Sequence, residues 1–92
     1  GGGVYVKGTF KMEGSARVDQ NNEVYLESGK TVTVTGALTH SPAARITPNN
    51  YSEGKVVVEG ASAEEANFTV TPNGSETWHL EKVGNELKLK KD

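Results

Sequence analysis

Apolar and polar residues alternate along this chain in short runs, and glycine, proline or asparagine ends most of them. The most regular run is residues 31–35, where valines occupy one face of an extended chain and threonines the other. Residues 1–14 contain two further runs, 4–6 and 9–12, with glycines on either side. Strands this short cannot bury an apolar face alone and must stack on similar strands. The pattern therefore predicts a β-structure built from repeated units.

The rest of the chain continues this pattern and leaves little room for helices. Residues 62–67 begin with Ser62 and place Glu65 three positions later, which predicts a single helical turn. Three consecutive valines within residues 55–59 are typical of a strand buried on both faces. These signals predict roughly nine or ten strands, at residues 4–6, 9–12, 16–18, 24–26, 31–35, 44–47, 55–59, 68–71, 78–83 and 86–90.

Strands without crossover helices can lie parallel only if the chain winds into a solenoid. We therefore expect an all-β fold, a right-handed parallel β-helix of about two to three coils with a C-terminal hairpin cap. This fold would pair residues 4–6, 24–26 and 56–58 in parallel. The alternative is a small antiparallel β-sandwich or roll, in which neighbouring strands pair antiparallel.

We expect a single β domain with three parts: a glycine-rich repeat unit at residues 1–20, further β coils at 21–75, and a terminal hairpin cap at 76–92. The asparagine pairs at residues 21–22 and 49–50 either stack at equivalent corners of the coils or are ordinary turn residues. The chain contains neither an initiator methionine nor a signal peptide, so we expect it to be a piece of a longer protein.

Composition excludes several classes of function. The 92 residues include no cysteine, so disulfides and thiolate chemistry are absent. The net charge is −2, and the basic residues form no cluster of the kind that binds nucleic acid. A membrane-spanning helix needs about 20 consecutive apolar residues, and no such run occurs.

Fragments of catalytic motifs occur, but each lacks a part that its chemistry requires. Residues 29–31 read Gly-Lys-Thr, the end of a phosphate-binding loop, but Val24 stands where that loop needs its first glycine. His40 and His79 are accompanied by no nucleophile-elbow sequence and have no short metal-binding spacing. We expect no enzymatic activity, no cofactor and no metal.

Acidic residues gather in one region, which raises the question of glycosidase or calcium chemistry. An acid pair for glycoside hydrolysis needs two carboxylates about 5–10 Å apart in a cleft, and the sequence does not fix such a distance. Residues 19–23 lack the spaced pattern of a dedicated calcium loop. Solvated strand faces account better for these residues, which are Glu13, Asp19, Glu23 and Glu27.

Four aromatic residues are the candidate ligand-binding residues. Tyr5, Tyr25, Tyr51 and Trp78 could together form a platform for sugar rings. The alternative is that the tyrosines are partly buried packing residues with solvated hydroxyls, and that Trp78 closes the end of the core.

The glycine-rich block resembles a known type of repeat. Its Gly-Gly-Gly-Val-Tyr-Val and Thr-Phe-x-Met-x-Gly elements are similar to repeats of bacterial cell-surface right-handed β-helix proteins. Residues 23–34, 45–48 and 68–78 resemble the closing region of treponeme-type surface proteins of spirochaetes. That family strings several glycine-rich blocks together, whereas this chain contains one. The resemblance implies export, exposure on the cell surface, and a structural or adhesive role.

The expected function is a non-catalytic structural or adhesive module, the terminal part of an exported bacterial surface protein. The alternative is a carbohydrate-binding or polysaccharide-degrading β-helix module. Expected partners are upstream coils of the parent chain, a host or glycan surface ligand, and further copies that associate through the N-terminal coil.

Overall fold

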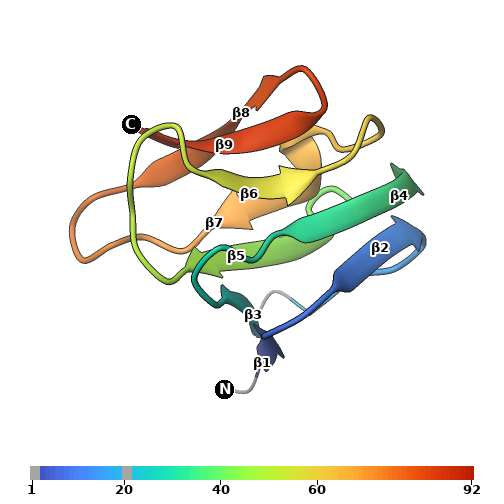
Figure 1. Cartoon of the computed structure of the whole chain (residues 1–92), viewed down its shortest axis with the longest axis horizontal. Helices are drawn as coiled ribbons and strands as arrows, with labels where there is room; N and C mark the ends of the chain where they lie inside the picture. The colour runs from blue at the N-terminus through green and yellow to red at the C-terminus, as the bar shows by residue number, and fades with distance from the viewer. Residues whose placement is uncertain (1–2, 20–21) are drawn as a thin grey trace.

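The computed structural model describes residues 3–19 and 22–92, and the protein is all-β, with 52% strand and 3% helix. Figure 1 shows the stack of strands rising from β1 at the N-terminal end to β9 and β8 at the C-terminal end. No helix in the described ranges is long and apolar enough to cross a membrane. The elements are β1 (Gly3–Val6), β2 (Phe10–Gly14), β3 (Glu23–Leu26), β4 (Val32–Leu38), β5 (Ala44–Pro48), β6 (Val56–Glu59), a 3-10 turn (Glu65–Asn67), β7 (Phe68–Val70), β8 (Trp78–Val83) and β9 (Glu86–Lys91).

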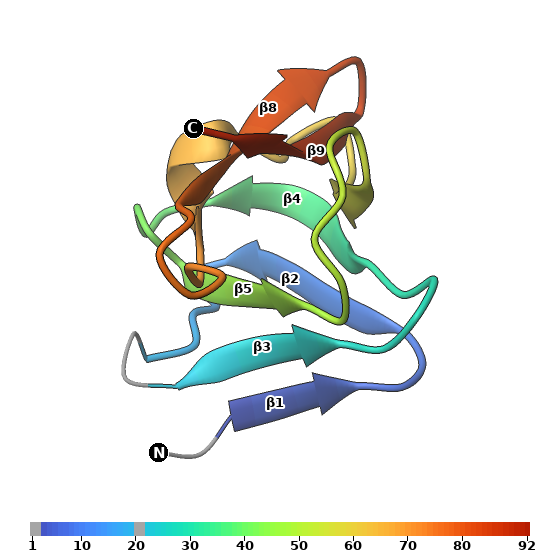
Figure 2. The same cartoon turned by 90° about the vertical axis from the view of Figure 1, so that its left-hand side faces the viewer.

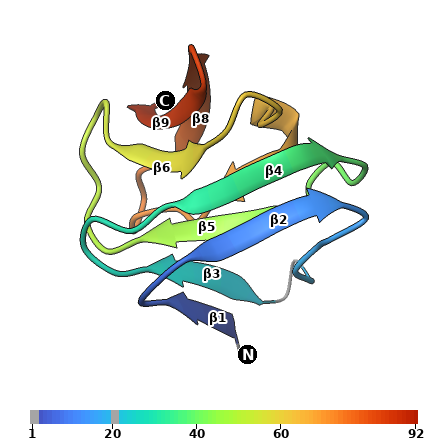
Figure 3. The same ribbon diagram turned by 45° about the vertical axis from the view of Figure 1, so that its right-hand side comes forward.

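The strands form two sheets, to which β1 to β8 contribute alternately, and β9 joins β8 in the second sheet. The first sheet has the order β1-β3-β5-β7, and all its pairings are parallel. The second has the order β2-β4-β6-β9-β8, in which β2, β4 and β6 are parallel and β9 and β8 are antiparallel. Figure 2 shows β1, β3 and β5 as successive layers, and Figure 3 shows the same for β2, β4 and β6.

This arrangement is a parallel β-solenoid of about three turns. Each coil supplies one strand to each sheet, first β1 and β2, then β3 and β4, then β5 and β6. The predicted solenoid class is thus confirmed, and the antiparallel sandwich or roll is excluded because the strands of successive coils pair in parallel.

The core is a stack of apolar side chains that point inward from both sheets. In the first sheet Val4, Val24, Ile46 and Val70 follow one another in register, so successive coils repeat after 20, 22 and 24 residues. Val24 and Ile46 are fully buried. Each aliphatic side chain buried in this way contributes about 1.5–3 kcal/mol to stability, and none could be buried by one coil alone.

One of the expected strand partners was wrong. Residues 4–6 and 24–26 pair in parallel as predicted, but their next neighbour is β5 and not residues 56–58. Those valines lie in β6 of the second sheet, where Val58 pairs with Val32 of β4. The reason is that each coil contains two strands, so alternate apolar runs of the sequence belong to opposite sheets.

Two local predictions also differ from the structure. Residues 16–18 form no strand, and the Val18 backbone N–H instead donates to the Ala43 carbonyl at 2.7 Å. The asparagine stack is wrong too, because Asn22 directly precedes β3 and Asn49 directly follows β5. The register Leu26 to Pro48 places Asn49 beside Glu27. Asn21 lies outside the described residues.

The C-terminal end of the solenoid is closed by a hairpin. Strand β9 pairs antiparallel with both β6 and β8. Four apolar residues of the hairpin point into the core and are buried, whereas Val83 is exposed and the lysines line the outer side. The buried residues are Trp78, Leu80, Leu87 and Leu89.

Gly60, which follows the last parallel strand, allows the backbone to pass close to both the hairpin and β4. Gly60 follows β6 with φ +132°, and its N–H donates to the Asn85 carbonyl of the hairpin turn at 2.7 Å. A Cβ atom at this position would lie 2.2 Å from the Val34 carbonyl oxygen of β4. A side chain here would therefore push the capping region away from the neighbouring coil.

Candidate functional site

The outer face of the first sheet contains the most organised group of polar and aromatic side chains. Residues alternate inward and outward along each strand, so outward residues of neighbouring coils form ladders. One ladder contains Tyr5, Tyr25 and Thr47, and a second contains Gly3, Glu23 and Arg45. The parallel register therefore brings together residues that are about 20 positions apart in sequence.

Tyr5 and Tyr25 stack on each other because they occupy paired positions of β1 and β3. Their ring centroids are 4.7 Å apart and the ring planes differ by 12°. Gly3 leaves room for this arrangement, because a Cβ there would lie 3.0 Å from a ring carbon of Tyr25 and 2.4 Å from the Glu23 carbonyl oxygen. Tyr5 is 66% exposed, so the pair presents a rigid aromatic surface to solvent.

Glu23 connects the tyrosine pair to the next two coils. The Tyr25 hydroxyl donates to Oε2 of Glu23 at 2.9 Å, and the Thr47 hydroxyl donates to Oε1 at 2.5 Å. The Thr71 hydroxyl reaches Oε1 at 3.4 Å, and Arg45 Nη2 lies 3.8 Å from Oε2. The Glu23 carboxylate thus fixes the position of the Tyr25 ring from one side of the sheet.

These contacts change the pKa values of both acidic groups. The hydrogen bond from Thr47 lowers the pKa of Glu23, and the hydrogen bond from Tyr25 and the charge of Arg45 act in the same direction. The pKa of Tyr25 is raised, chiefly because its hydroxyl donates to the Glu23 carboxylate. At neutral pH the acceptor is therefore ionised and the donor keeps its proton.

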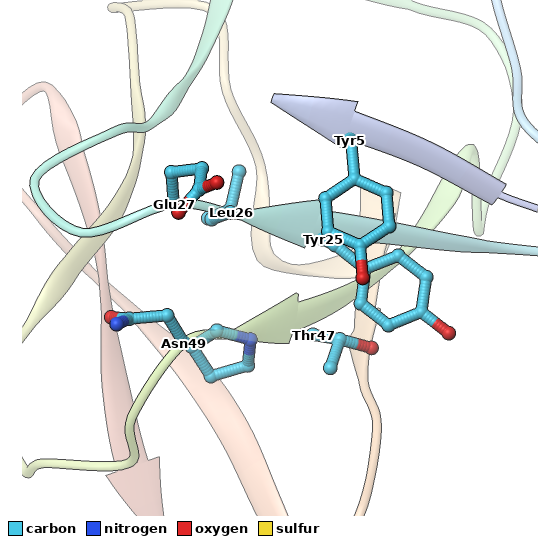
Figure 4. A pocket seen from close by; sticks show the side chains of 7 residues that line it. Tyr5, Tyr25, Leu26, Glu27, Thr47 and Asn49 are labelled. Carbon is cyan, nitrogen blue, oxygen red and sulfur yellow. The ribbon is translucent and has the colours of Figure 1, made fainter. Parts of the chain in front are cut away.

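A shallow pocket lies beside the tyrosine pair. Figure 4 shows the two rings on one side, with Glu27 and Asn49 across from them. Its volume is about 170 Å³, below the roughly 300–1,000 Å³ of typical small-molecule sites. The lining residues are Tyr5, Tyr25, Leu26, Glu27, Thr47, Pro48 and Asn49.

The chemistry of this lining suits binding better than catalysis. Glu27 is the one carboxylate among the lining residues, and glycoside hydrolysis needs two carboxyl groups flanking the bond. The tyrosines supply apolar surface, and Asn49 and Thr47 supply neutral polar groups. An apolar surface with a few polar groups at its edge is the usual form of a ligand site.

The other two aromatic candidates lie apart from this surface. Tyr51 and Trp78 form a separate tilted pair, with centroids 5.5 Å apart and planes at 47°. Trp78 is 9% exposed, and the Tyr51 hydroxyl donates to the Thr71 carbonyl at 2.6 Å. Burial raises the pKa of Tyr51. The structure therefore divides the four aromatic residues into an exposed pair and a packed pair, and ligand binding stays a prediction.

The remaining candidate residues are dispersed over the surface. His79 contacts the Asp92 carboxylate at the C-terminus, whereas the His40 carbonyl accepts a hydrogen bond from Asn67 Nδ2 at 3.1 Å. Glu13 accepts from the Thr35 hydroxyl at 2.5 Å on the second sheet. Within residues 3–19 and 22–92, no three histidine or acidic side chains come together as a metal site.

Glu23 is the residue whose role the sequence did not reveal. Its alternation with Tyr25 places both side chains on one face of a strand, but its other partners, Thr47 and Thr71, are 24 and 48 positions away. Only the register between coils brings them together. The signal that could have pointed to it is the recurrence of Val-Tyr at residues 4–5 and 24–25, 20 positions apart.

The molecule thus belongs to the class of parallel β-solenoids, with an exposed aromatic pair on one outer face. Comparison of the chain with protein-family models, curated proteins and solved structures found no match. Its function is therefore inferred from its geometry and its sequence.

Proposed function

We propose that this chain is a non-catalytic structural or adhesive module, the terminal part of an exported bacterial surface protein. The observation that supports this most is the difference between the two ends of the solenoid. One end is closed by the antiparallel hairpin β8–β9, and the other ends on the parallel strands β1 and β2. A terminal module needs one closed end and one end that can join another coil.

The open end has the form that another parallel coil would extend. Within the described residues, β1 and β2 each have a strand neighbour on one side only. Val4 and Phe10 are half-buried there and pack on the core. A preceding coil would pair with both strands and cover these side chains. The partner proposed for this end is accordingly an upstream coil of the parent chain.

The cellular context rests on the sequence. The glycine-rich block and the closing segments resemble bacterial surface β-helix proteins, and absent cysteine is compatible with export. The non-catalytic assignment is supported by the single carboxylate among the pocket-lining residues. A carbohydrate-binding module is the second candidate, and the exposed Tyr5–Tyr25 pair favours it.

Insertion of an extra coil tests the proposed terminal role. A second copy of residues 3–22, inserted between Gly2 and Gly3, would follow the 20-residue spacing from Val4 to Val24. We expect the copy to fold onto β1 and β2, to raise the melting temperature, and to protect the amides of both strands from hydrogen exchange.

The matched control replaces the copied Val4, Val6, Phe10 and Met12 with aspartate. It should leave the melting temperature and the exchange of β1 and β2 unchanged, because the added coil then has no apolar face to bury. If the unaltered insert also exchanges freely and adds no stability, the proposal that this end receives a coil is wrong.

A further inference from the structure

We propose that the pocket beside Tyr5 and Tyr25 binds one ring of a neutral saccharide. This inference specifies the second candidate function and does not depend on the first. Sugar rings have a face of C–H groups and a rim of hydroxyls, so they need a flat apolar surface bordered by polar groups. The pocket offers both within about 170 Å³.

The aromatic surface is held in place before any ligand arrives. Tyr25 is fixed by its stacking on Tyr5 and by the hydrogen bond from its hydroxyl to Glu23. Tyr5 is 66% exposed although it stacks on one side. A site whose side chains are already ordered loses less conformational entropy on binding. Glu23 is thus a positioning residue for this surface.

The polar groups across the pocket match the hydroxyls of a sugar. Lys55 Nζ donates to Asn49 Oδ1 at 3.0 Å, so this amide would offer a ligand its Nδ2 hydrogens. Glu27 contributes a carboxylate that accepts hydrogen bonds. A sugar hydroxyl both donates and accepts, so neighbouring hydroxyls can bond Glu27 and Asn49 together.

The charge of the lining and the geometry of the rings favour a neutral saccharide over an acidic polysaccharide or a quaternary ammonium ion. The seven lining residues include the Glu27 carboxylate and no lysine or arginine, and the Lys55 ammonium beside Asn49 already donates to oxygens of Asn49 and Asn50. The lining itself therefore disfavours an acidic polysaccharide. Quaternary ammonium ions are bound by aromatic rings that surround them as a cage. Tyr5 and Tyr25 are nearly parallel and stacked on each other, so they form one shared surface and not the walls of a cage.

The test is a titration of the 15N-labelled full chain, followed by two-dimensional NMR. The probes are neutral hexasaccharides of glucose, mannose and N-acetylglucosamine, a polygalacturonate oligomer, and tetramethylammonium chloride. We expect at least one neutral hexasaccharide to bind and to shift the amides of Tyr5, Leu26, Glu27 and Asn49 selectively. Tyr5→Ala should weaken that binding about tenfold.

Tyr5 is exposed, so its replacement should leave the fold intact. Val83→Ala is the matched control, because Val83 is an exposed apolar residue of the hairpin, and it should bind as the unaltered chain does. The proposal is overturned if no neutral hexasaccharide binds, if the shifts lie elsewhere, or if Tyr5→Ala binds equally well. Stronger binding of tetramethylammonium or polygalacturonate would also overturn it. None of these results bears on the extra-coil experiment.

Discussion

The two ends of the solenoid differ in structure: an antiparallel hairpin covers the C-terminal end, whereas the N-terminal end consists of parallel strands. At the C-terminal end, β9 pairs antiparallel with β6, and Leu87 of β9 is fully buried opposite Val58. At the N-terminal end, β1 and β2 keep the direction of the coils, and Val4 and Tyr5 retain contact with solvent. A parallel coil presents the same hydrogen-bonding edge to the next coil, so it can be extended. An antiparallel hairpin with outward lysines ends the stack.

This comparison explains where stability should concentrate. The capped end buries apolar groups of β6, β8 and β9 in one place, whereas Val4 and Phe10 at the open end are only half-buried. The free energy of local unfolding should therefore rise along the chain from β1 toward β9. The open end is also where the aromatic pair lies, so the region proposed to bind is the less stable half.

The largest expected effect is the loss of a buried leucine from the cap. Leu87→Ala should lower the free energy of unfolding by about 2–5 kcal/mol, because Leu87 is fully buried opposite Val58. Val4→Ala, at the open end, should cost about 1 kcal/mol or less, since Val4 is half-buried. Urea denaturation of both variants measures the difference. Equal losses would mean that the ends are equally packed.

Replacement of the junction glycine should have the next largest effect. Gly60→Ala should lower the free energy of unfolding by about 1–3 kcal/mol, because φ is +132° and the new Cβ would meet the Val34 carbonyl. Gly74→Ala is the matched control: its φ is +63°, but no atom lies within 4 Å of the added Cβ. Thermal unfolding compares the two. A loss at Gly74 as large as that at Gly60 would show that backbone strain alone is responsible and that the close approach to β4 is not.

The smallest expected effect is a pH dependence of stability that arises from Glu23, near the open end. The pKa of Glu23 is lowered from its ordinary value of 4.5, first by the hydrogen bond from Thr47. A carboxyl group with a lowered folded-state pKa stabilises the fold above its unfolded pKa, and this contribution is lost as pH falls through the folded value. Stability should therefore decrease as the pH drops below 4.5.

Glu23→Gln should make that decrease shallower, and urea denaturation between neutral and acidic pH measures it. Glu81→Gln, on the exposed side of the hairpin, is the control and should leave the decrease as it was. If the stability of Glu23→Gln falls with pH as steeply as that of the unaltered chain, the hydrogen bonds from Thr47 and Thr71 to Glu23 do not stabilise the contact between coils.

The sequence predicted the elements of this fold better than their partners. Alternation identified residues 4–6 and 24–26, and short runs between glycines indicated a stacked β-structure. The sheet to which residues 56–58 belong could not be predicted, because it depends on the length of every preceding coil. The sequence predicted a strand at residues 16–18, but Ala16 and Val18 pack on the core from a loop.

The candidate site was also predictable only in part, because the sequence pattern indicates strands but not all of their neighbours. Val-Tyr-Val at residues 4–6 and Val-Tyr-Leu at 24–26 have the same pattern, so a 20-residue repeat would stack Tyr5 on Tyr25. Trp78 could not be separated from them by residue type, since burial depends on the position of the hairpin. The contacts of Glu23 with Thr47 and Thr71 required the register of three coils.

Native-state hydrogen exchange of the full chain tests most directly whether one end is closed and the other open. We expect the amides of β4, β6 and β9 to exchange only through global unfolding, and those of β1 and β2 to exchange through local opening at a lower free energy. Equal protection of β1 and β9, or faster exchange in β9, would contradict this account of the two ends.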